Sequence, residues 1–388
     1  MKQTKTYLSK TVDELKPSGI RRFFDLAAGM EGVISLGVGE PDFVTSWSIR
    51  EAAILSLEQG YTSYTANAGL MELREEISKY MKKDFAVNYS AKSEIIVTVG
   101  ASQALDIALR AIVDPGDEVI VIEPSFVSYA PLVTLAGGKP VTVQTRKEND
   151  FKITRRELEQ AITNRTKAII LCSPNNPTGT MLNQRDLEEF AQVAKKYDLM
   201  ILSDEIYAEL SYDEKFVSLA AIDGMWDRTI LISGFSKGFA MTGWRLGFVC
   251  APEEITQAML KIHQYAMMCA PTMAQFAAVE ALKSGEDDVS EMRKSYRRRR
   301  NYFIQSLNDL GLDCHIPGGA FYAFPSVEST GLTSELFAER LLMEEKVAVV
   351  PGNVFGASGE GHIRCSYASS LEQLQESVKR IKRFLDRL

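Results

Sequence analysis

A single lysine follows an apolar, strand-like run near the middle of the chain. Lys237 stands in the stretch FSKGFAMTGWR, directly after TILISG, and Arg245 comes eight residues later. A lysine amine that is shielded from water and close to other cations loses its proton more easily, and it can then form a Schiff base with a carbonyl group. The planar guanidinium of arginine suits a phosphate. The stretch therefore has three interpretations: a catalytic amine, a phosphate ligand, or only a charge at the end of a strand.

Other strand-like runs also end in polar residues. EIIVTVG is followed by Ala101 and Ser102 at the start of a predicted helix, where backbone N–H groups and the helix dipole favour an anion; a helix cap by Ser102 is the alternative. AIILC is followed by SPNNPTGT, a rigid turn that presents Asn176. LMILS is followed by Asp204 and, three residues later, Tyr207. A helix cap is again the alternative there, although a buried carboxylate without a partner would be costly.

The elements that must position these side chains alternate between short apolar strands and amphipathic helices. Runs such as AIILC and MILS are apolar without alternation, which is typical of strands covered on both faces in a parallel sheet. We therefore expect an α/β fold with a mostly parallel sheet between helices, and LGFVCAP is a candidate antiparallel strand. Ligands of such sheets bind beyond the carboxyl ends of the strands, so the polar residues should meet there.

The C-terminal part of the chain has a different pattern. It is charged and helical from about residue 285, and then continues through short apolar runs to a closing helix. A chain of 388 residues is too long for one compact core, so two domains are expected. We place residues 46–285 in a large ligand-binding domain and residues 286–388 in a smaller α+β domain, to which residues 1–45 add an N-terminal segment.

Composition limits the class of protein. A net charge of −7 and 45% hydrophobic residues are typical of a soluble globular enzyme and argue against a nucleic-acid surface. The N-terminus shows no signal-peptide pattern, and no apolar run approaches the roughly 20 residues of a membrane span, so we expect a cytoplasmic protein. The five cysteines form no CxxC framework and the three histidines have no metal-binding spacing. Reduced thiols and no metal site are therefore expected.

One basic run, RKSYRRRR at residues 293–300, follows the acidic GEDDVSEM. We expect a solvated helix whose opposite charges pair at i,i+4 spacing, and a polyanion site is the alternative.

Taken together, the polar strand ends match one cofactor. A pyridine nitrogen needs a carboxylate, a phenolate oxygen needs amide and phenol donors, a phosphate needs an anion site and a guanidinium, and an aldehyde needs a lysine. Pyridoxal phosphate requires this whole set. The corresponding residues are Asp204, Asn176, Tyr207, Ala101, Ser102, Arg245 and Lys237.

With these motifs in order, the chain closely resembles the class I/II aminotransferases, which are pyridoxal-phosphate enzymes of fold type I. The resemblance covers nearly the whole chain. Its most specific motifs are SPNNPTG, SDEIY and SKGFAMTGWR, and it also includes LGVGEPDF, SYTANAG, GGAFYAFP, VVPG and HIRCSYA. The pattern is most similar to the bacterial and archaeal branch that includes aspartate, aromatic, alanine and N-acetyl-diaminopimelate aminotransferases.

The resemblance implies a role for each matching residue. Lys237 would hold the cofactor as a Schiff base and move the Cα proton, and Asp204 would pair with the pyridinium nitrogen. Tyr207 and Asn176 would bind the ring oxygen, with Asn176 also near the substrate. The remaining cofactor contacts would come from Ala101, Ser102, Ser236 and Arg245 at the phosphate and from Phe126 stacked on the ring.

Substrate binding and assembly are implied in the same way. Arg364 in HIRCSY would bind the substrate α-carboxylate through both guanidinium nitrogens, and the backbone of Gly39 would contact the same group. Tyr64 in SYTANAG matches a tyrosine that reaches the phosphate in the neighbouring subunit. A homodimer with shared active sites is therefore implied.

Two positions depart from the family's pattern. Gly234 stands where some members have a phosphate-binding serine, which leaves Ser236 or the backbone to compensate. Phe126 replaces the tryptophan of many relatives, which weakens an assignment to the aspartate branch, and a core aromatic is the alternative interpretation of Phe126.

The implied reaction is a ping-pong transfer of an amino group from an L-amino acid to a 2-oxo acid, with 2-oxoglutarate expected as acceptor. A C–S β-lyase would use the same lysine, aspartate and asparagine, so the motifs separate these two reactions poorly. A non-catalytic, cofactor-sensing regulator would need a DNA-binding module, and a dinucleotide-binding oxidoreductase would need a GxGxxG after an early strand. The sequence shows neither feature.

Overall fold

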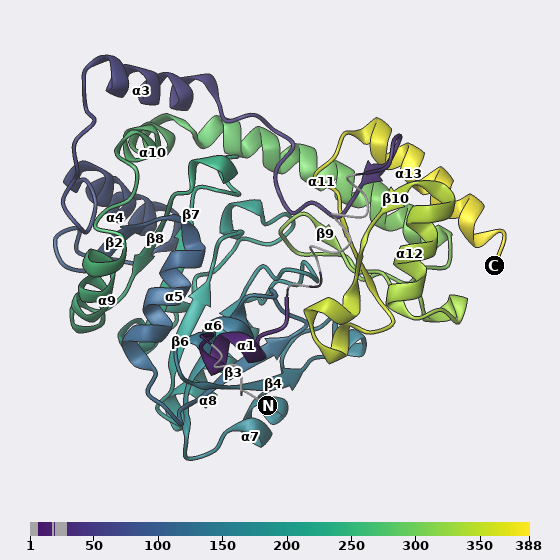
Figure 1. Cartoon of the computed structure of the whole chain (residues 1–388), viewed down its shortest axis with the longest axis horizontal. Helices are drawn as coiled ribbons and strands as arrows, with labels where there is room; N and C mark the ends of the chain where they lie inside the picture. The colour runs from purple at the N-terminus through teal and green to yellow at the C-terminus, as the bar shows by residue number, and fades with distance from the viewer. Residues whose placement is uncertain (1–6, 18, 20–28) are drawn as a thin grey trace, which may run out of the picture.

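The computed structural model describes residues 7–17, 19 and 29–388. Its larger part is built on a seven-stranded sheet (Figure 1). The spatial order of the strands is β2 (Ile95–Thr98), β8 (Gly247–Cys250), β7 (Thr229–Gly234), β6 (Met200–Asp204), β5 (Thr166–Cys172), β3 (Glu118–Glu123) and β4 (Lys139–Gln144). Strand β8 is antiparallel to both of its neighbours, and all other pairs are parallel. The expected α/β fold and its antiparallel strand are confirmed.

Helices cover both faces of this sheet. They are α3 (Trp47–Glu58), α4 (Met71–Phe85), α5 (Gly100–Ile112), α6 (Tyr129–Leu135), α7 (Arg155–Ala161), α8 (Gln184–Lys196), α9 (Glu253–Ala266) and α10 (Thr272–Ser284). Successive residues of one strand serve opposite faces: Ile170 packs with α5, α6 and α9, whereas Ile169 packs with α7 and α8. Because both faces are covered, every residue of β2, β7 and β8 is buried.

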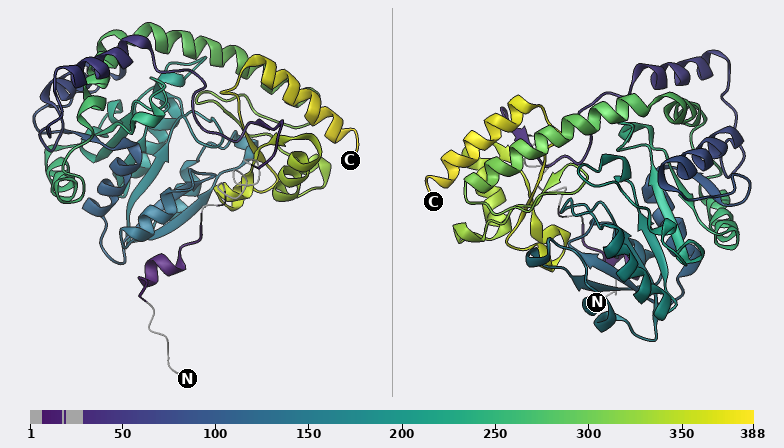
Figure 2. Two further views of the ribbon diagram at one scale, coloured as in Figure 1. Left: turned by 45° about the horizontal axis from the view of Figure 1, so that its top comes forward. Right: turned by 180° about the vertical axis from the view of Figure 1, so that it is seen from behind.

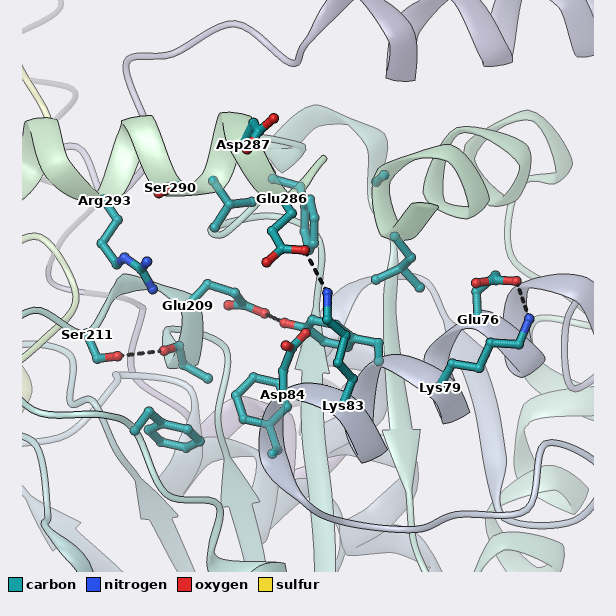
Figure 3. Close-up of a pocket in the computed structure, with 18 of the residues that line it drawn as sticks. Glu76, Lys79, Lys83, Asp84, Glu209, Ser211, Glu286, Asp287, Ser290 and Arg293 are labelled. Carbon is teal, nitrogen blue, oxygen red and sulfur yellow. Dashed lines mark hydrogen bonds and ion pairs between the residues drawn. The ribbon is translucent and has the colours of Figure 1, made fainter. Parts of the chain in front are cut away.

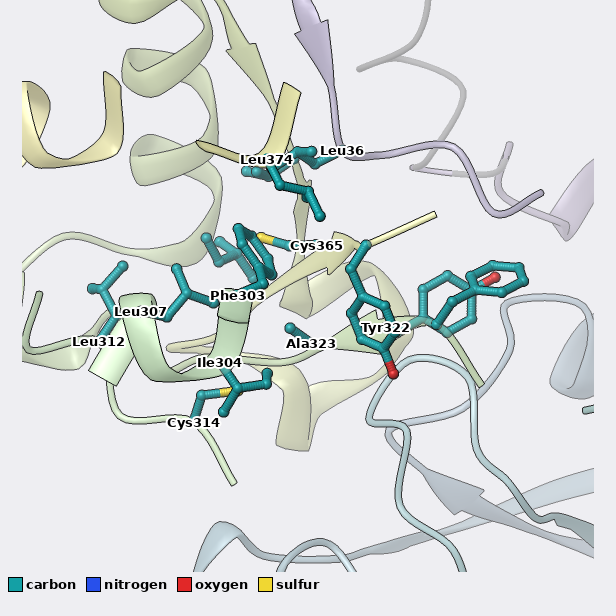
Figure 4. Close-up of a cluster of buried hydrophobic side chains, with 14 of the residues drawn as sticks. Leu36, Phe303, Ile304, Leu307, Leu312, Cys314, Tyr322, Ala323, Cys365 and Leu374 are labelled. Atoms are coloured by element: carbon teal, nitrogen blue, oxygen red, sulfur yellow. The ribbon is translucent and has the colours of Figure 1, made fainter. Parts of the chain in front are cut away.

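The smaller part gathers the C-terminal elements around a second core (Figures 1 and 4). Its helices are α11 (Glu286–Asp309), α12 (Ser334–Glu345) and α13 (Leu371–Leu385). An antiparallel sheet runs in the order β11 (Val350–Pro351), β12 (Ile363–Ser366), β9 (Tyr322–Ala323), and β1 (Ile34–Ser35) pairs in parallel with β10 (Val347–Ala348). Leu36 is buried in this core together with Phe303 and Leu374, so the segment that contains β1 joins the C-terminal elements in it.

Helix α11 connects the two parts. It begins directly after Gly285, where α10 has ended, and runs across to α13 (Figure 2). The predicted domain limit at residue 285 falls at this junction, and the limits themselves stay a prediction. Among the described residues before β1, the short helix α1 (Lys10–Glu14) has no buried residue and lies beside α6, in the larger part of the molecule.

The basic run on α11 differs from its expectation. Arg297 and Arg300 both bind the carboxylate of Asp213, at 2.9 and 2.7 Å, and Arg299 binds Asp42 at 2.8 Å. Arg300 is only 2% exposed. The expected i,i+4 pairing on a solvated face is therefore wrong for these three arginines, because α11 crosses the molecule and meets acidic residues of other segments. None of the helices formed by the described residues is both long and apolar enough to cross a membrane.

Candidate active site

The polar residues that follow the strands surround one cavity of about 420 Å³. Eleven of the predicted site residues line it: Gly39, Ala101, Ser102, Phe126, Asn176, Asp204, Tyr207, Ser236, Lys237, Arg245 and Arg364. Parallel strands bring their carboxyl ends to one edge of the sheet, and the segment around Gly39 and strand β12 close the cavity from the smaller part. Tyr64 is the predicted site residue that lies elsewhere, and it is 80% exposed.

Three glycines hold the strand ends close together at one corner of the cavity. A Cβ atom on Gly247 would lie 2.6 Å from the Ala101 nitrogen, and one on Gly234 would lie 2.8 Å from the Gly247 Cα. Gly100 has a positive φ of 75° and would direct a Cβ to within 3.0 Å of the Arg245 guanidinium. The backbone packing explains why Gly234 is not a serine, since no side chain fits between β7 and β8 here.

This corner presents an anion site. Helix α5 begins at Gly100, so its first free N–H groups point into the cavity beside the Arg245 guanidinium. Val99, not Ser102, is the N-cap residue of α5. The alternative interpretation of Ser102 as a helix cap is therefore wrong, and Ser102 and Ser236 both line the cavity instead.

Lys237 enters the cavity from the turn after β7. Its Nζ donates a hydrogen bond of 2.5 Å to the backbone carbonyl of Gly39. Burial, and then the nearby Arg364 guanidinium, lower the pKa of the amine from 10.5 to about 8. A substantial fraction of the amine is therefore neutral, and so nucleophilic and basic, near physiological pH.

Asp204 ends β6 and is 5% exposed. Its carboxylate accepts a hydrogen bond of 2.6 Å from the Tyr129 hydroxyl and one of 3.3 Å from the Ile206 N–H. Burial raises the pKa of Asp204, and the Tyr129 hydrogen bond opposes that rise. In register beside Asp204 on β5 lies Cys172, whose thiol pKa is also raised by burial, so the thiol stays protonated.

Arg364 on β12 is 3% exposed and is held by neutral groups. Its guanidinium donates to the Asn176 Oδ1 at 2.9 Å and to the Gly37 carbonyl at 2.6 Å, and its Nε has no hydrogen-bond partner among the described residues. The ring of Tyr322 lies 4.6 Å from the guanidinium carbon. A buried guanidinium that has no anionic partner among the described residues can bind a carboxylate.

The structure adds residues that sequence reasoning missed. The hydroxyls of Tyr322 and Tyr207 are 2.8 Å apart, so Tyr322 contacts both Tyr207 and the guanidinium of Arg364. Gly39 has to remain small because its Cβ would lie 2.5 Å from the Tyr322 hydroxyl. Tyr129 is the partner of Asp204. Tyr322 stands in GGAFYAFP, but nothing in that motif indicated a contact across more than a hundred residues of sequence.

Comparison with known proteins agrees with this geometry. A model of the family "Aminotransferase class I and II" matches residues 31–381. The chain is 67% identical to YugH of Bacillus subtilis (strain 168), covering 98% of each chain. It is 50% identical to the aspartate aminotransferase of Pyrococcus abyssi, covering 97% of this chain and 98% of that one.

Solved structures give the same answer. The aromatic aminotransferase of Pyrococcus horikoshii superposes with a TM-score of 0.90 at 47% identity, covering 95% of this chain and 99% of that one. The aspartate aminotransferase of Thermus thermophilus with maleate superposes with a TM-score of 0.93 at 40% identity, covering 98% and 100%. The chain belongs to the class I and II aminotransferase family and is an aminotransferase.

Proposed function

We propose that this aminotransferase uses pyridoxal phosphate to move the amino group of an L-amino acid to a 2-oxo acid by a ping-pong mechanism. The observation that carries the proposal is the Lys237 amine, buried in a cavity that has a carboxylate on one wall and an anion site in one corner. The family to which the chain belongs uses this cofactor.

The polar groups that line the cavity match the polar groups of the cofactor. The buried Asp204 carboxylate has two hydrogen-bond donors and no ion-pair partner among the described residues, so a protonated ring nitrogen would complete it. The N-terminus of α5, Ser102, Ser236 and Arg245 form a cradle for a phosphate. Tyr207 and Asn176 would hold the ring oxygen, and Phe126 would lie against the ring. Bound there, pyridoxal phosphate supplies an aldehyde that takes up the amino group and a ring that withdraws electrons from the substrate Cα.

The chain's own residues would then do two kinds of work. Lys237 moves a proton at the substrate Cα, and its lowered pKa suits a group that must both accept and return a proton. Arg364 binds the α-carboxylate, and Asn176 and the Gly37 carbonyl fix the direction of its guanidinium. Tyr129 keeps the Asp204 carboxylate in place.

The proposed donor is aspartate, alanine, an aromatic amino acid or a related L-amino acid, and the proposed acceptor is 2-oxoglutarate. Relatives of this chain are described as aspartate and as aromatic-amino-acid aminotransferases. Among the described residues that line the cavity, the cations are Lys237, Arg245 and Arg364, each of which already has a role. A second carboxylate of a dicarboxylic substrate would therefore need a cation from outside this lining.

A homodimer with shared active sites is part of the proposal. Large apolar side chains are exposed along α3 and the segments beside it: Trp47, Ile54, Leu55, Leu57, Tyr61, Tyr64, Tyr265, Met267 and Met268. Hydrogen bonds from Asn67 to the Met268 carbonyl and from Thr272 to the Ser63 carbonyl join these segments into one face. An apolar face of this kind favours a second copy of the chain, and Tyr64 would reach from it to the partner's phosphate.

The proposal is tested by following the cofactor absorbance after adding single amino donors, without acceptor, and then after adding 2-oxoglutarate or pyruvate. The donor should change the absorbance, and the acceptor should reverse the change with stoichiometric formation of a new amino acid. Lys237→Ala should abolish both steps. Pyruvate released from a sulfur amino acid without any acceptor would favour the β-lyase, and substantial turnover by Lys237→Ala would refute the role of the lysine.

A further inference from the structure

A second cavity, of about 580 Å³, is lined by the residues that follow Tyr207 and Lys237 in the sequence (Figure 3). Its walls come from α4, the short 3₁₀ helix Ala208–Leu210, Phe239, the end of α10 and the start of α11. Most charged groups at its rim are exposed. Two polar side chains within the cavity, Glu209 and Tyr80, are joined by a hydrogen bond. Both contact the turn after β7 that carries Lys237.

Glu209 packs directly against that turn. A Cβ atom built on Gly238 would lie 2.8 Å from both Cδ and Oε2 of Glu209, and 2.9 Å from its Cγ. The Tyr80 hydroxyl donates a hydrogen bond to Glu209 Oε1, and Figure 3 marks this bond by the dashed line at Glu209. Oε2 is buried and has no hydrogen-bond partner among the described residues. Only one of the two carboxyl oxygens therefore has a hydrogen-bond partner, and burying the other costs free energy. Packing against Gly238, rather than hydrogen bonding alone, accounts for the position of this group.

Tyr80 supports the next residue of the same turn. Its ring packs edge-on against the ring of Phe239, with centroids 6.4 Å apart. The Phe239 ring also contacts Phe235, at 5.6 Å, and would meet a Cβ on Gly285 at 3.3 Å. Gly238 and Phe239, which directly follow Lys237, are therefore held in place by Glu209 and Tyr80. These two side chains are joined by a hydrogen bond.

We propose that Glu209 and Tyr80 are positioning residues for Lys237, acting through Gly238 and Phe239. A lysine that transfers a proton must hold its amine within a fraction of an ångström of the productive place, and its long side chain is only as well placed as its backbone. Glu209 fixes the position of the turn backbone through its contact with Gly238. Tyr80 in turn fixes the Glu209 side chain through the hydrogen bond between them. The inference rests on the proposed role of Lys237.

The first test compares three variants in steady-state transamination. Glu209→Ala removes the packing contact and the hydrogen bond, and it should lower kcat about 10-fold or more with KM nearly unchanged. Glu209→Gln keeps the shape and an acceptor for Tyr80, and it should restore kcat to within about 3-fold of the parent protein. Tyr80→Phe should fall between them. Asp287→Ala, at the exposed rim of the same cavity, is the matched control and should behave as the parent protein.

A second test uses Gly238, which has no positive φ and whose added Cβ would meet Glu209 as its nearest neighbour. Gly238→Ala should push the Glu209 side chain away and reproduce the loss in kcat. The double variant Gly238→Ala/Glu209→Ala should be no slower than Glu209→Ala alone, because both changes break the same contact. Additive losses would contradict the proposal.

A third measurement does not depend on turnover. Trace acylation of the cofactor-free protein, with the labelled Lys237 quantified by mass spectrometry at several pH values, reports the pKa of the amine. Glu209→Ala should raise this pKa toward that of an ordinary lysine, because a displaced amine gains contact with water and moves away from Arg364, while Glu209→Gln should leave it near 8.

Normal kcat and normal labelling in Glu209→Ala would overturn the proposal. So would a loss in kcat that Glu209→Gln does not restore. Failure of the proposed function gives a different result, namely turnover that survives Lys237→Ala.

Discussion

At Lys237, two physical effects act on the amine in the same direction. Burial removes water from the ammonium group, and the guanidinium of Arg364 repels its charge, so the pKa falls from 10.5 to about 8. The folded protein therefore binds a proton at this site less tightly than the unfolded chain does. Burying the charged form of Lys237 therefore lowers the free energy of unfolding, and this effect can be measured.

Lys237→Met should stabilise the cofactor-free protein at pH 7. Well below pH 8 both the folded and the unfolded chain hold the proton, and the buried charge costs about 3 kcal/mol. Between pH 8 and 10.5 the unfolded chain binds more protons, so the free energy of unfolding of the parent protein rises with pH. Urea unfolding at several pH values should therefore show the advantage of the variant shrinking through this window, and a constant advantage would contradict the lowered pKa.

At the scale of the elements, the sheet positions the site through close contacts between backbones. Strands β7 and β8 and the start of α5 approach one another through Gly234, Gly247 and Gly100. This contact sets the first N–H groups of α5 against the carboxyl end of β7, which leads directly into Lys237. A side chain on Gly247, at the centre of this contact, would collide with backbone atoms. The strands and the helix start would have to move apart to make room for it.

Gly247→Ala should be strongly destabilising. Its Cβ would meet the Ala101 nitrogen, the Gly100 carbonyl carbon and the Ser233 carbonyl oxygen at 2.6, 2.7 and 3.0 Å. Overpacking of this kind should cost about 3 kcal/mol or more in the free energy of unfolding. Gly29→Ala, whose new Cβ would have no atom of the described residues within 4 Å, should change it by less than about 0.5 kcal/mol. Equal stability of the two variants in urea unfolding would contradict this packing account.

Much of the sheet and its ligand edge could be predicted from the sequence, because runs such as TILISG and AIILC are apolar on both faces and end in polar residues. Tyr322 and Glu209 could not be predicted, since their contacts with Tyr207 and Gly238 arise only when separate elements fold together. The pairing of Arg297, Arg299 and Arg300 was mispredicted for the same reason. Local spacing on a helix does not reveal carboxylates that arrive from other segments.

At the scale of the whole molecule, the segment that runs from β1 to α3 and the long helix α11 join the smaller part to the larger one (Figure 1). The cavity takes Lys237 and Asp204 from the sheet and Arg364 and Tyr322 from the smaller part. Exposed apolar side chains gather on a different face, which includes Tyr64. The proposed dimer would complete each site with a residue from that face.

Shared sites predict complementation between two inactive variants. Tyr64→Ala should bind the cofactor more weakly, and Lys237→Ala should be inactive. Equal mixing with exchange of subunits makes half of the dimers mixed, and each mixed dimer has one site with both parent residues, so activity at limiting cofactor should recover to about a quarter of the parent value. Lys237→Ala mixed with Asp204→Ala is the control: both residues serve the site of their own chain, so no site is restored. Failure of the first mixture, despite proven subunit exchange, would contradict the sharing of sites.

Borohydride reduction of the protein purified with pyridoxal phosphate shows whether Lys237 is the residue that holds the cofactor. Reduction makes a Schiff base permanent, and peptide mass spectrometry then locates it. We predict one pyridoxyl adduct per chain, on the peptide that contains Lys237, and its absence from Lys237→Ala. An adduct on a different lysine, or none in a protein that catalyses transamination, would contradict the account.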